Sequence, residues 1–584
     1  MTVKTAILVA VLIGLTWLNP LRLSAQQRAF PSVLLIMSDD QGWGDVHAHG
    51  NDVIHTPNMD HLAAAGVQFE RFFVSPVCAP TRASLLTGRY DVRTGVSGVT
   101  GRQEVMRAEE VTLAEVLKSA GYATGCFGKW HNGEQYPNHP AGQGFDQFFG
   151  FCGGHWNNYF TPTLEHNGQT VQPDGYITDV ITDAAIDFIK ANADRPFLCY
   201  VPYNAPHTPW QVSDRWFAKY EGRGLNIATQ SAYAMVENID HNIGRMLATL
   251  QAEEIDRQTI VIFLTDNGPN GSRYNGQMRG AKGSVHEGGM RVPLFVRWPG
   301  TLKPKIVSQI AAHIDLLPTL ADLCGVALPA TRPRDGRSLA PLMRDQDPAP
   351  PWPDRKIMTY RRTGGNQVRG AVRTQQYRFV REKTDQLYDM VADPSQRHDI
   401  SLSRPVVMRE LQQAWEEFAA EIAPSIADRS PIPVGYTVAA RVELPAVEAQ
   451  LGDQVRFYNG QGWAHDWITD FDDSGDRVSW TLEVVEGGRY QVDLSFAGPA
   501  SAAGTRLSTD VQGQQLDWAV ESFDSPVTGR PERTVEKGVR WVREFRTATL
   551  GTVELSAGAA VLTLAVPQKI PGGLDVNAVR LTKQ

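Results

Sequence analysis

Two largely apolar segments far apart in the chain have the same organisation, and together they restrict the fold most strongly. Residues 32–37 and 259–264 are runs of strand length, and each is followed directly by oxygen-bearing side chains. Such a run is typical of a strand buried on both faces of a parallel sheet. A sheet of this kind needs helices on both faces. The sequence therefore predicts an α/β fold in which two strands end in polar pairs.

These polar pairs are Asp39 with Asp40, and Asp266 with Asn267. Open α/β sheets bind ligands at the carboxyl ends of their strands. Adjacent carboxylates repel each other unless a cation compensates them, and oxygen atoms are the ligands of hard metal ions. One pair alone is equally compatible with a solvated turn. Two such pairs at two strand ends favour a metal site.

A cysteine opens a predicted helix at residues 78–87. Pro80 suits the first helical turn, and Gly88 is a natural helix stop. Cys78 therefore lies at the positive end of a helix dipole, where anions are favoured. The alternative is a half-buried structural cysteine.

The segment from Cys78 to Gly88 contains cysteine-x-proline-threonine-arginine followed by leucine-threonine-glycine. It resembles the signature of the sulfatase family, and the resemblance extends over about residues 30–425. In that family the cysteine is oxidised to formylglycine (3-oxoalanine), the catalytic aldehyde. The resemblance implies a formylglycine-generating or sulfatase-maturating enzyme as a partner during biosynthesis. It also implies an alkaline-phosphatase-like mixed sheet flanked by helices, with a small α+β C-terminal subdomain.

The resemblance also implies a calcium ion. Its expected ligands are Asp39, Asp40, Cys78, Asp266 and Asn267.

Three further elements carry charges and histidines that match the family. Lys129 and His131 are two residues apart in an extended segment and therefore point the same way, although a surface Lys-x-His is also common. His207 stands between two prolines, which stiffen its loop. Lys282 lies in a Gly-x-Lys segment that precedes Glu-Gly-Gly-x-Arg-x-Pro.

By resemblance, Arg82, Lys129 and Lys282 neutralise the sulfate oxygens. His207, with Lys282, protonates the leaving oxygen, and His131 acts on the hydrated aldehyde. One hydroxyl of that hydrate attacks sulfur and the other expels sulfate, a release for which a plain thiol has no easy route. The predicted activity is sulfuric ester hydrolysis. The alternatives are a phosphonate or phosphate monoester hydrolase of the same fold and an inactive glycan-binding protein.

Residues 144–166 are rich in glycine and aromatic side chains without periodicity, which predicts a long loop. We expect this loop to line the substrate pocket, although a packed aromatic loop without ligand contacts is an alternative. The candidate substrate-binding residues are His155, Trp156, Asn157, Arg273 and Arg279.

The chain divides into four predicted segments. Residues 1–25 form a signal peptide, residues 26–345 the catalytic α/β domain, residues 346–428 the smaller subdomain and residues 432–584 an all-β sandwich. The signal peptide predicts an exported protein, periplasmic or extracellular, without stable membrane insertion after cleavage.

The predicted sandwich ends in a strand that resembles those of galactose-binding-like or carbohydrate-binding modules. Four tryptophans are candidates for a sugar-stacking face, but tryptophan in a sandwich is also common in the core: Trp463, Trp467, Trp518 and Trp541. Export and a carbohydrate-binding appendage favour a sulfated glycan as the substrate.

Composition excludes other classes. The net charge is −8 and no long basic run occurs, which argues against nucleic acid as a partner. Five cysteines are too few for a disulfide scaffold, and a Cys126–Cys152 bridge stays open.

Overall fold

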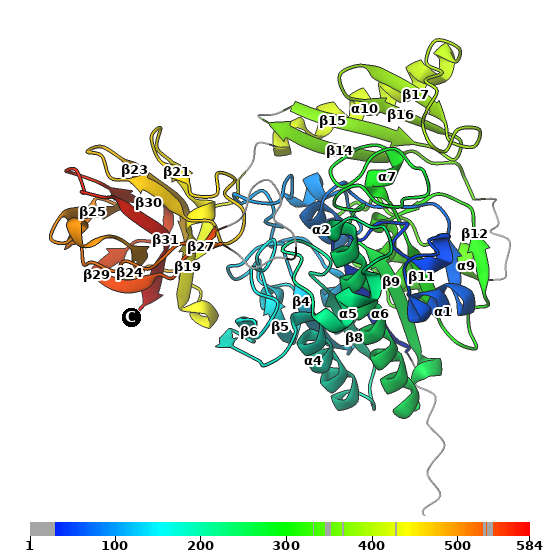
Figure 1. The fold of residues 1–584 in the computed structure, drawn as a ribbon, viewed down its shortest axis with the longest axis horizontal. Helices are drawn as coiled ribbons and strands as arrows, with labels where there is room; N and C mark the ends of the chain where they lie inside the picture. Colours follow the sequence, from blue (N-terminus) through cyan, green and yellow to red (C-terminus); the bar gives the residue numbers. More distant parts are fainter. Residues whose placement is uncertain are drawn as a thin grey trace, which may run out of the picture.

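The computed structural model describes residues 30–330, 332–344, 352–364, 367–426, 429–529, 533 and 541–584. The predicted signal peptide lies outside the described residues. The described chain forms a large α/β part, a small sheet packed against one long helix, and a β-sandwich at one side (Figure 1).

A ten-stranded mixed sheet forms the centre of the α/β part. In spatial order its strands are β12 (Lys305–Val307), β2 (Val67–Phe69), β11 (Leu294–Arg297), β9 (Thr259–Thr265), β1 (Ser32–Ser38), β8 (Phe197–Pro202), β4 (Ala123–Lys129), β5 (Gln147–Phe151), β6 (Leu164–His166) and β7 (Gln169–Val171). Strand β1 pairs in parallel with β8 and β9, and β8 pairs in parallel with β4. Since parallel strands end on the same side of a sheet, the residues after these four strands meet there.

Helices cover both faces of this sheet, as its apolar strands require. In β1, Val33, Leu35 and Met37 enter one core, whereas Leu34 and Ile36 enter the other. The first core includes α2 (Cys78–Thr87), α3 (Leu113–Ser119) and α8 (Leu316–Leu323). The second includes α1 (Pro57–Ala65), α4 (Ile177–Ala191) and α6 (Ile227–Ala252). The predicted α/β class is confirmed. The remaining short elements of this part are α5 (Asp214–Phe217), α7 (Glu287–Met290), α9 (Ala340–Met343), β3 (Phe72–Phe73), β10 (Arg291–Val292) and β13 (Ala311–Ala312).

The prediction of one continuous loop over residues 144–166 is wrong at both ends. Strand β5 extends the sheet beside β4, and β6 begins at Leu164. The sequence of β5 is Gln-Phe-Phe-Gly-Phe, which has no clear alternation. A Cβ atom at Gly150 would lie 1.9 Å from the carbonyl oxygen of Gly128, so glycine permits this strand pairing. The actual loop is confined to residues 152–163.

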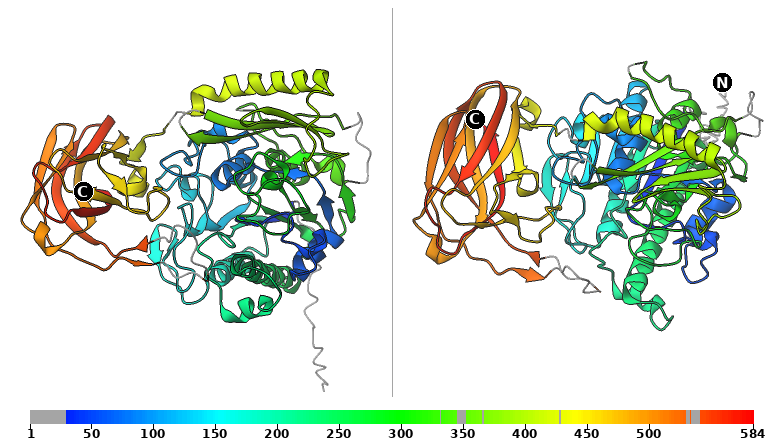
Figure 2. Two further views of the ribbon diagram at one scale, coloured as in Figure 1. Left: turned by 45° about the horizontal axis from the view of Figure 1, so that its top comes forward. Right: turned by 90° about the horizontal axis from the view of Figure 1, so that it is seen from above.

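The small sheet carries one long helix on its outer face (Figure 2). Its antiparallel strands are β14 (Ile357–Gly364), β15 (Gln367–Arg373), β16 (Tyr377–Arg381) and β17 (Asp385–Asp389), and α10 (Pro405–Ile426) packs across them. The indole of Trp415 lies directly over Gly370, where a Cβ atom would come within 1.9 Å of the ring. This is the predicted α+β arrangement.

The C-terminal part is the expected all-β sandwich, built from two six-stranded sheets. One sheet contains β18 (Ile432–Val434), β20 (Gln450–Leu451), β23 (Arg477–Val484), β30 (Gly558–Ala565), β25 (Arg506–Val511) and β26 (Gln514–Ala519). The other contains β19 (Arg441–Pro445), β21 (Arg456–Phe457), β22 (Ile468–Phe471), β31 (Leu574–Lys583), β24 (Gly488–Ala497) and β29 (Arg546–Leu555). A separate ribbon of β27 (Thr528–Gly529) and β28 (Trp541–Val542) extends towards the α/β part (Figure 2).

The four candidate tryptophans of the sandwich divide into two kinds. Trp467 is buried and donates its indole N–H to Asp575 at 2.8 Å, and Trp518 packs edge-on against Phe496. Both therefore belong to packing. Trp463 and Trp541 are 39% and 40% exposed.

Among the described residues, no helix is long and apolar enough to cross a membrane. All five cysteines are free thiols, so no disulfide joins Cys126 to Cys152.

The buried His313 gives a testable pH dependence of stability. Its Nε2 lies 3.1 Å from the hydroxyl of Ser75, and burial lowers its pKa to about 3. The unfolded chain binds this proton near pH 6.5. Stability is therefore lost as pH falls from about 6.5 towards 3, by up to about 1.4 kcal/mol per pH unit. We expect His313→Gln to reduce this slope in urea unfolding between pH 5 and 7.5.

The control for this measurement is His398→Gln, because the side chain of His398 is 81% exposed. Its slope should match that of the unmodified protein. An unchanged slope in His313→Gln would contradict the assignment.

Candidate active site

The carboxyl ends of β1 and β9 bring the two polar pairs together. Asp39, Asp40, Asp266 and Asn267 are all fully buried. The backbone N–H of Asp40 donates to the Asp266 carboxylate at 3.2 Å. The side-chain amide of Asn267 donates to the Asp40 carboxylate at 2.9 Å. These four of the five predicted metal ligands thus form one cluster.

Helix α2 aims its first residue at this cluster. Val77 is extended and Cys78 begins the helix, which ends at Gly88 with φ 69°, a conformation that favours glycine. Cys78 is 3% exposed. Its sulfur and one carboxylate oxygen each from Asp39 and Asp266 all lie within 4.8 Å of one another.

Two buried cations pair with Asp39 and Asp266. Arg82, one turn after Cys78, approaches Asp266 at 2.8 Å and Asp39 at 3.7 Å, and it also donates to the carbonyl of Lys129 at 2.8 Å. The ammonium of Lys129, at the end of β4, lies 2.5 Å from Asp39.

The other carboxylate, Asp40, faces Lys282 and His207. The Lys282 ammonium lies 2.5 Å from one of its oxygens, and the Nε2 atom of His207 lies 3.7 Å from the other. The side chains of His207 and Lys282 are 13% and 20% exposed, whereas those of Arg82 and Lys129 are fully buried. The cluster is therefore open to solvent on the side of His207 and Lys282.

The crowded charges perturb one another. Burial raises the pKa of Asp39, but Lys129, His207 and Arg82 outweigh burial, and the net result is a lowered pKa. For Asp266, burial and the charge of Asp39 outweigh the opposing effect of Arg82, so its pKa rises to about 7. A further cation beside these carboxylates would relieve their repulsion.

Three buried oxygens of the cluster make no hydrogen bond within the described residues. They are Oδ1 of Asp39, Oδ2 of Asp40 and Oδ1 of Asn267. An unpaired buried carboxylate oxygen is costly, and a hard divalent cation with oxygen ligands satisfies it. The donor set therefore fits such an ion. Because three carboxylates face three side-chain cations, a bound divalent cation would leave the cluster net positive, which suits an anionic substrate.

The two site histidines are held differently. Nε2 of His131 lies 3.0 Å from the carbonyl oxygen of Val99, and Nδ1 of His207 lies 2.6 Å from that of Thr208. A carbonyl only accepts, so each of these nitrogens carries the proton of a neutral ring. Burial, with the nearby Lys129, lowers the pKa of His131 well below its ordinary value, and burial with Lys282 lowers that of His207 to about 4.

The 152–163 loop lies beside His207. The ring of His155 stacks on that of His207 at 5.8 Å and an interplanar angle of 9°. Trp156 packs against Phe151, and the carbonyl of Asn157 accepts a hydrogen bond from Gln211. The structure thus brings the predicted His155 to the site, with Trp156 next to it in the same loop.

The two predicted arginines have protein partners. The side chain of Arg273 is 3% exposed, forms an ion pair with Asp45 and donates to the carbonyl of Asp40 at 2.7 Å. It therefore supports the backbone that carries Asp40 and does not face the open side of the cluster. Arg279 donates to the hydroxyl of Tyr388 at 2.7 Å, towards the small sheet.

Sequence analysis missed three residues that contact the histidines of the site. Val99 holds His131 through its backbone carbonyl, and Gly154 leaves room for the same ring, since a Cβ atom there would lie 2.7 Å from Nε2. His465, from the sandwich, contacts His155. A carbonyl contact carries no side-chain signal, and His465 lies outside every catalytic motif.

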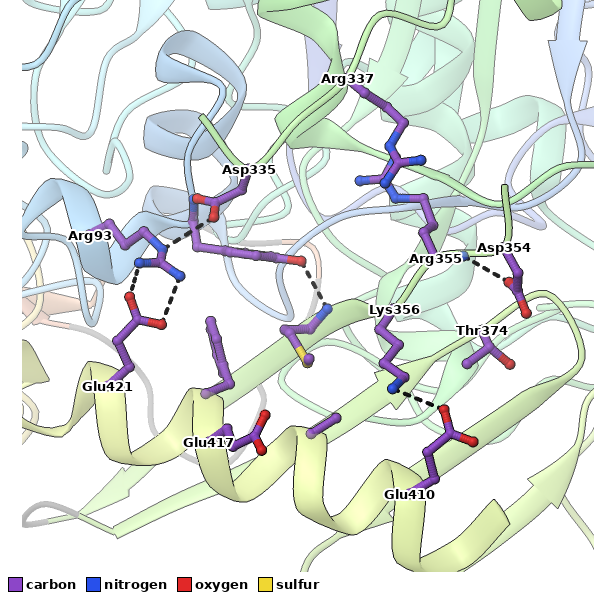
Figure 3. A pocket seen from close by; sticks show the side chains of 14 residues that line it. Arg93, Asp335, Arg337, Asp354, Arg355, Lys356, Thr374, Glu410, Glu417 and Glu421 are labelled. Carbon is purple, nitrogen blue, oxygen red and sulfur yellow. Dashed lines mark hydrogen bonds and ion pairs between the residues drawn. The ribbon is translucent and has the colours of Figure 1, made fainter. Parts of the chain in front are cut away.

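A separate cavity of about 660 Å³ lies between α10, β14 and the loops of the α/β part (Figure 3). None of the predicted site residues lines it. Its charged side chains pair with each other, as Arg93 does with Glu421 and Lys356 with Glu410. We therefore do not regard this cavity as the active site.

Comparison with known proteins agrees with this geometry. The sulfatase family model matches residues 31–326, and the model of the N-sulphoglucosamine sulphohydrolase C-terminal region matches residues 281–421. The chain is 33% identical to human arylsulfatase A over 415 residues, covering 64% of this chain and 79% of that protein. It is 35% identical to N-acetylgalactosamine-6-sulfatase of Canis lupus familiaris over 352 residues, covering 54% of this chain and 66% of that protein, just under two thirds of its length.

Among solved structures, Ps i-CgsB in complex with k-i-k-neocarrahexaose is similar, with a TM-score of 0.64 and 29% identity. The alignment covers 68% of this chain and 94% of that one. With its fold, its family matches and its cluster of site residues, the chain belongs to the sulfatase family.

Proposed function

We propose that the protein is a sulfuric ester hydrolase that removes sulfate from a sulfated carbohydrate. One observation carries the proposal. Cys78 opens α2 inside a buried cluster of carboxylates and cations, within the cysteine-x-proline-threonine-arginine sequence of the family. Such a cluster can hold a tetrahedral anion and stabilise the charge that develops as the ester breaks.

The proposed nucleophile is the hydrate of formylglycine formed from Cys78. Burial, together with Asp39 and Asp266, raises the pKa of the Cys78 thiol above its ordinary value despite Lys129 and Lys282. A buried thiol with a raised pKa is a poor nucleophile at neutral pH. The environment therefore disfavours a thiolate nucleophile at this position.

The proposed metal is calcium. Its ligands would be Asp39, Asp40, Asp266, Asn267 and the modified residue 78, all of which adjoin the unpaired buried oxygens. When bound, the ion would supply positive charge to polarise the sulfate group.

The remaining side chains would neutralise charge and transfer protons. Arg82, Lys129 and Lys282 would neutralise the anionic oxygens. His131 is neutral with its Nε2 proton held by Val99, so Nδ1 is the atom that can accept a proton. His207 holds one proton on Nδ1, and a bound anionic sulfate would favour a second proton on Nε2 for the leaving oxygen.

The substrate class follows from several features together. N-acetylgalactosamine-6-sulfatase is named for a sulfated sugar, and Ps i-CgsB is described with a bound neocarrahexaose. The predicted signal peptide supports export to the periplasm or the extracellular space. A maturation enzyme that oxidises Cys78 is the other expected partner. We also propose the domain boundaries predicted above, with the catalytic domain at residues 26–345 and the sandwich at residues 432–584.

The first test concerns Cys78. Protein made with a formylglycine-generating enzyme should show, by mass analysis of the tryptic peptide, an aldehyde in place of the thiol. Cys78→Ala should lose at least about a thousandfold in kcat/KM, because no nucleophile remains. Cys324→Ala, at a buried cysteine of the α8 end, is the matched control. An intact thiol in a fully active protein would refute the proposal.

The second test concerns calcium and is read by stability. After treatment with a chelator, added Ca²⁺ should raise Tm, since an ion that binds only the folded state at about 100 times its Kd adds about 2.7 kcal/mol. Asp40→Asn should weaken this response. Asp183→Asn, at a side chain 57% exposed in a pair with Arg245, should keep it. If added Ca²⁺ does not change the Tm of the protein without substitutions, this would count against the metal site.

The third test separates sulfatase from the alternative phosphonate or phosphate monoester hydrolase. Sulfate and phosphate esters have the same shape and differ in charge. We expect 4-nitrophenyl sulfate to be cleaved with a kcat/KM at least about tenfold above that of 4-nitrophenyl phosphate, a difference of about 1.4 kcal/mol. The reverse order would favour the alternative. Glycan binding without turnover of either ester, after confirmed modification, would indicate the inactive binding protein.

A further inference from the structure

The β-sandwich is fixed to the α/β part by buried polar contacts. The Arg102 guanidinium pairs with Glu448 of the sandwich at 3.0 Å, and both side chains are almost fully buried. Arg102 also donates to the carbonyl of Pro431, and Gln135 donates to Glu448 at 3.0 Å. A buried network of charge-assisted hydrogen bonds of this kind sets the position of the sandwich relative to the active site.

One loop of the sandwich, residues 459–466, reaches the segments around the active site. The Nε2 atom of His465 lies 3.1 Å from the carbonyl oxygen of His155. The hydroxyl of Thr100 donates to the carbonyl of Gly462. The loop therefore touches two separate segments of the α/β part.

Each of these two segments contacts a proposed catalytic histidine. His465 packs edge-on against His155 at 5.6 Å and against Trp156 at 4.5 Å, and His155 stacks on His207. A single ring thus separates His465 from His207. On the other side, Val99, the neighbour of Thr100, binds His131.

The loop has a defined internal structure. The buried Asp466 accepts hydrogen bonds from the backbone N–H groups of Asn459 and Gly462 at 3.0 and 3.1 Å. His465 has φ 66°, a left-handed conformation that is uncommon for residues other than glycine and is found at binding sites. Such a conformation is retained because the surrounding contacts hold it.

Two exposed tryptophans belong to this loop or adjoin it. Trp463 lies two residues before His465, and the backbone N–H of Trp541 donates to the side chain of Asn459 at 2.8 Å. They are the two that do not serve the sandwich core, at 39% and 40% exposure. An exposed indole offers a flat apolar surface, which suits the C–H face of a sugar ring.

We propose that the 459–466 loop forms a sugar subsite on the leaving-group side of the active site. Trp463 would stack on a sugar unit of a sulfated oligosaccharide, Trp541 adjoins the same loop through Asn459, and His465 would be a positioning residue for His155 and His207. This proposal rests on the proposed function, because His207 faces the leaving oxygen only if the protein cleaves a sulfate ester. The leaving group of a glycan sulfate is the sugar itself, so the chain of rings from His207 to His465 marks the side on which the glycan lies.

The test compares small and large substrates. The small one is 4-nitrocatechol sulfate. The large ones are hexasaccharides of chondroitin 4-sulfate, chondroitin 6-sulfate, heparan sulfate and carrageenan, of which the best cleaved is used. Trp463→Ala should lower kcat/KM on that hexasaccharide about tenfold, mainly through KM, and change it less than about twofold on 4-nitrocatechol sulfate. Trp463→Phe should retain most of the activity.

His465→Ala should act differently, because its role is positional. We expect a lower kcat on both substrates with little change in KM, since His155, the ring stacked on His207, loses the contact that holds it. His465→Gln keeps an N–H donor for the His155 carbonyl and should restore part of kcat. Val561→Ala, at a side chain 49% exposed on β30, is the control in the sandwich and should change neither substrate. An unchanged kcat in a folded His465→Ala protein, or no recovery in His465→Gln, would remove His465 from the proposal.

Three outcomes would overturn the subsite. They are an equal loss on both substrates in Trp463→Ala, no loss on either, and a wild-type protein that cleaves 4-nitrocatechol sulfate but none of the hexasaccharides. A direct binding measurement distinguishes failure of the sugar subsite from failure of the proposed hydrolase function. In Cys78→Ala protein, adding Trp463→Ala should weaken calorimetric binding of the same panel of hexasaccharides about tenfold, whether or not the native protein hydrolyses sulfate. No turnover of any sulfate ester with this binding difference intact would refute the function and leave the subsite standing.

Discussion

The balance of buried charge at the ends of β1 and β9 is the constraint on which the site depends. Three carboxylates, Asp39, Asp40 and Asp266, are removed from water and face Arg82, Lys129 and Lys282. Removing one member of such a set leaves an uncompensated charge in the interior, which costs about 3–5 kcal/mol. Among the described residues, the same arrangement leaves three buried oxygens without hydrogen-bond partners, and this is the basis for the cation that we propose here.

This constraint explains the architecture around the cluster. Ion pairs between residues more than 200 positions apart, such as Arg273 with Asp45, need rigid elements to hold them. Parallel strands buried on both faces supply that rigidity, and α2 adds Cys78 and Arg82 from one helical turn. His207 lies on the open side of the cluster, where a substrate can arrive, whereas His131 is buried.

Sequence reasoning succeeds where function depends on local pattern. The apolar runs of β1 and β9, with polar pairs directly after them, predict both the sheet and the place where Asp39 and Asp266 meet. The helix that begins at Cys78 is likewise announced by Pro80 and Gly88. Prediction from sequence fails where a structural feature depends on a tertiary contact. Strand β5 exists because Gly150 permits close pairing with β4, and His465 reaches His155 only through the docking of the sandwich.

The burial of Cys78 has a consequence for the order of events in the cell. Cys78 is the first residue of α2 and is only 3% exposed, so another protein cannot reach its sulfur in the folded chain. If an enzyme oxidises Cys78 as we propose, it must therefore meet the chain while this segment is still extended, before α2 packs onto the sheet. Maturation and folding would then compete for the same interval, and a chain that folds first would be well packed and stable but would keep the unmodified thiol.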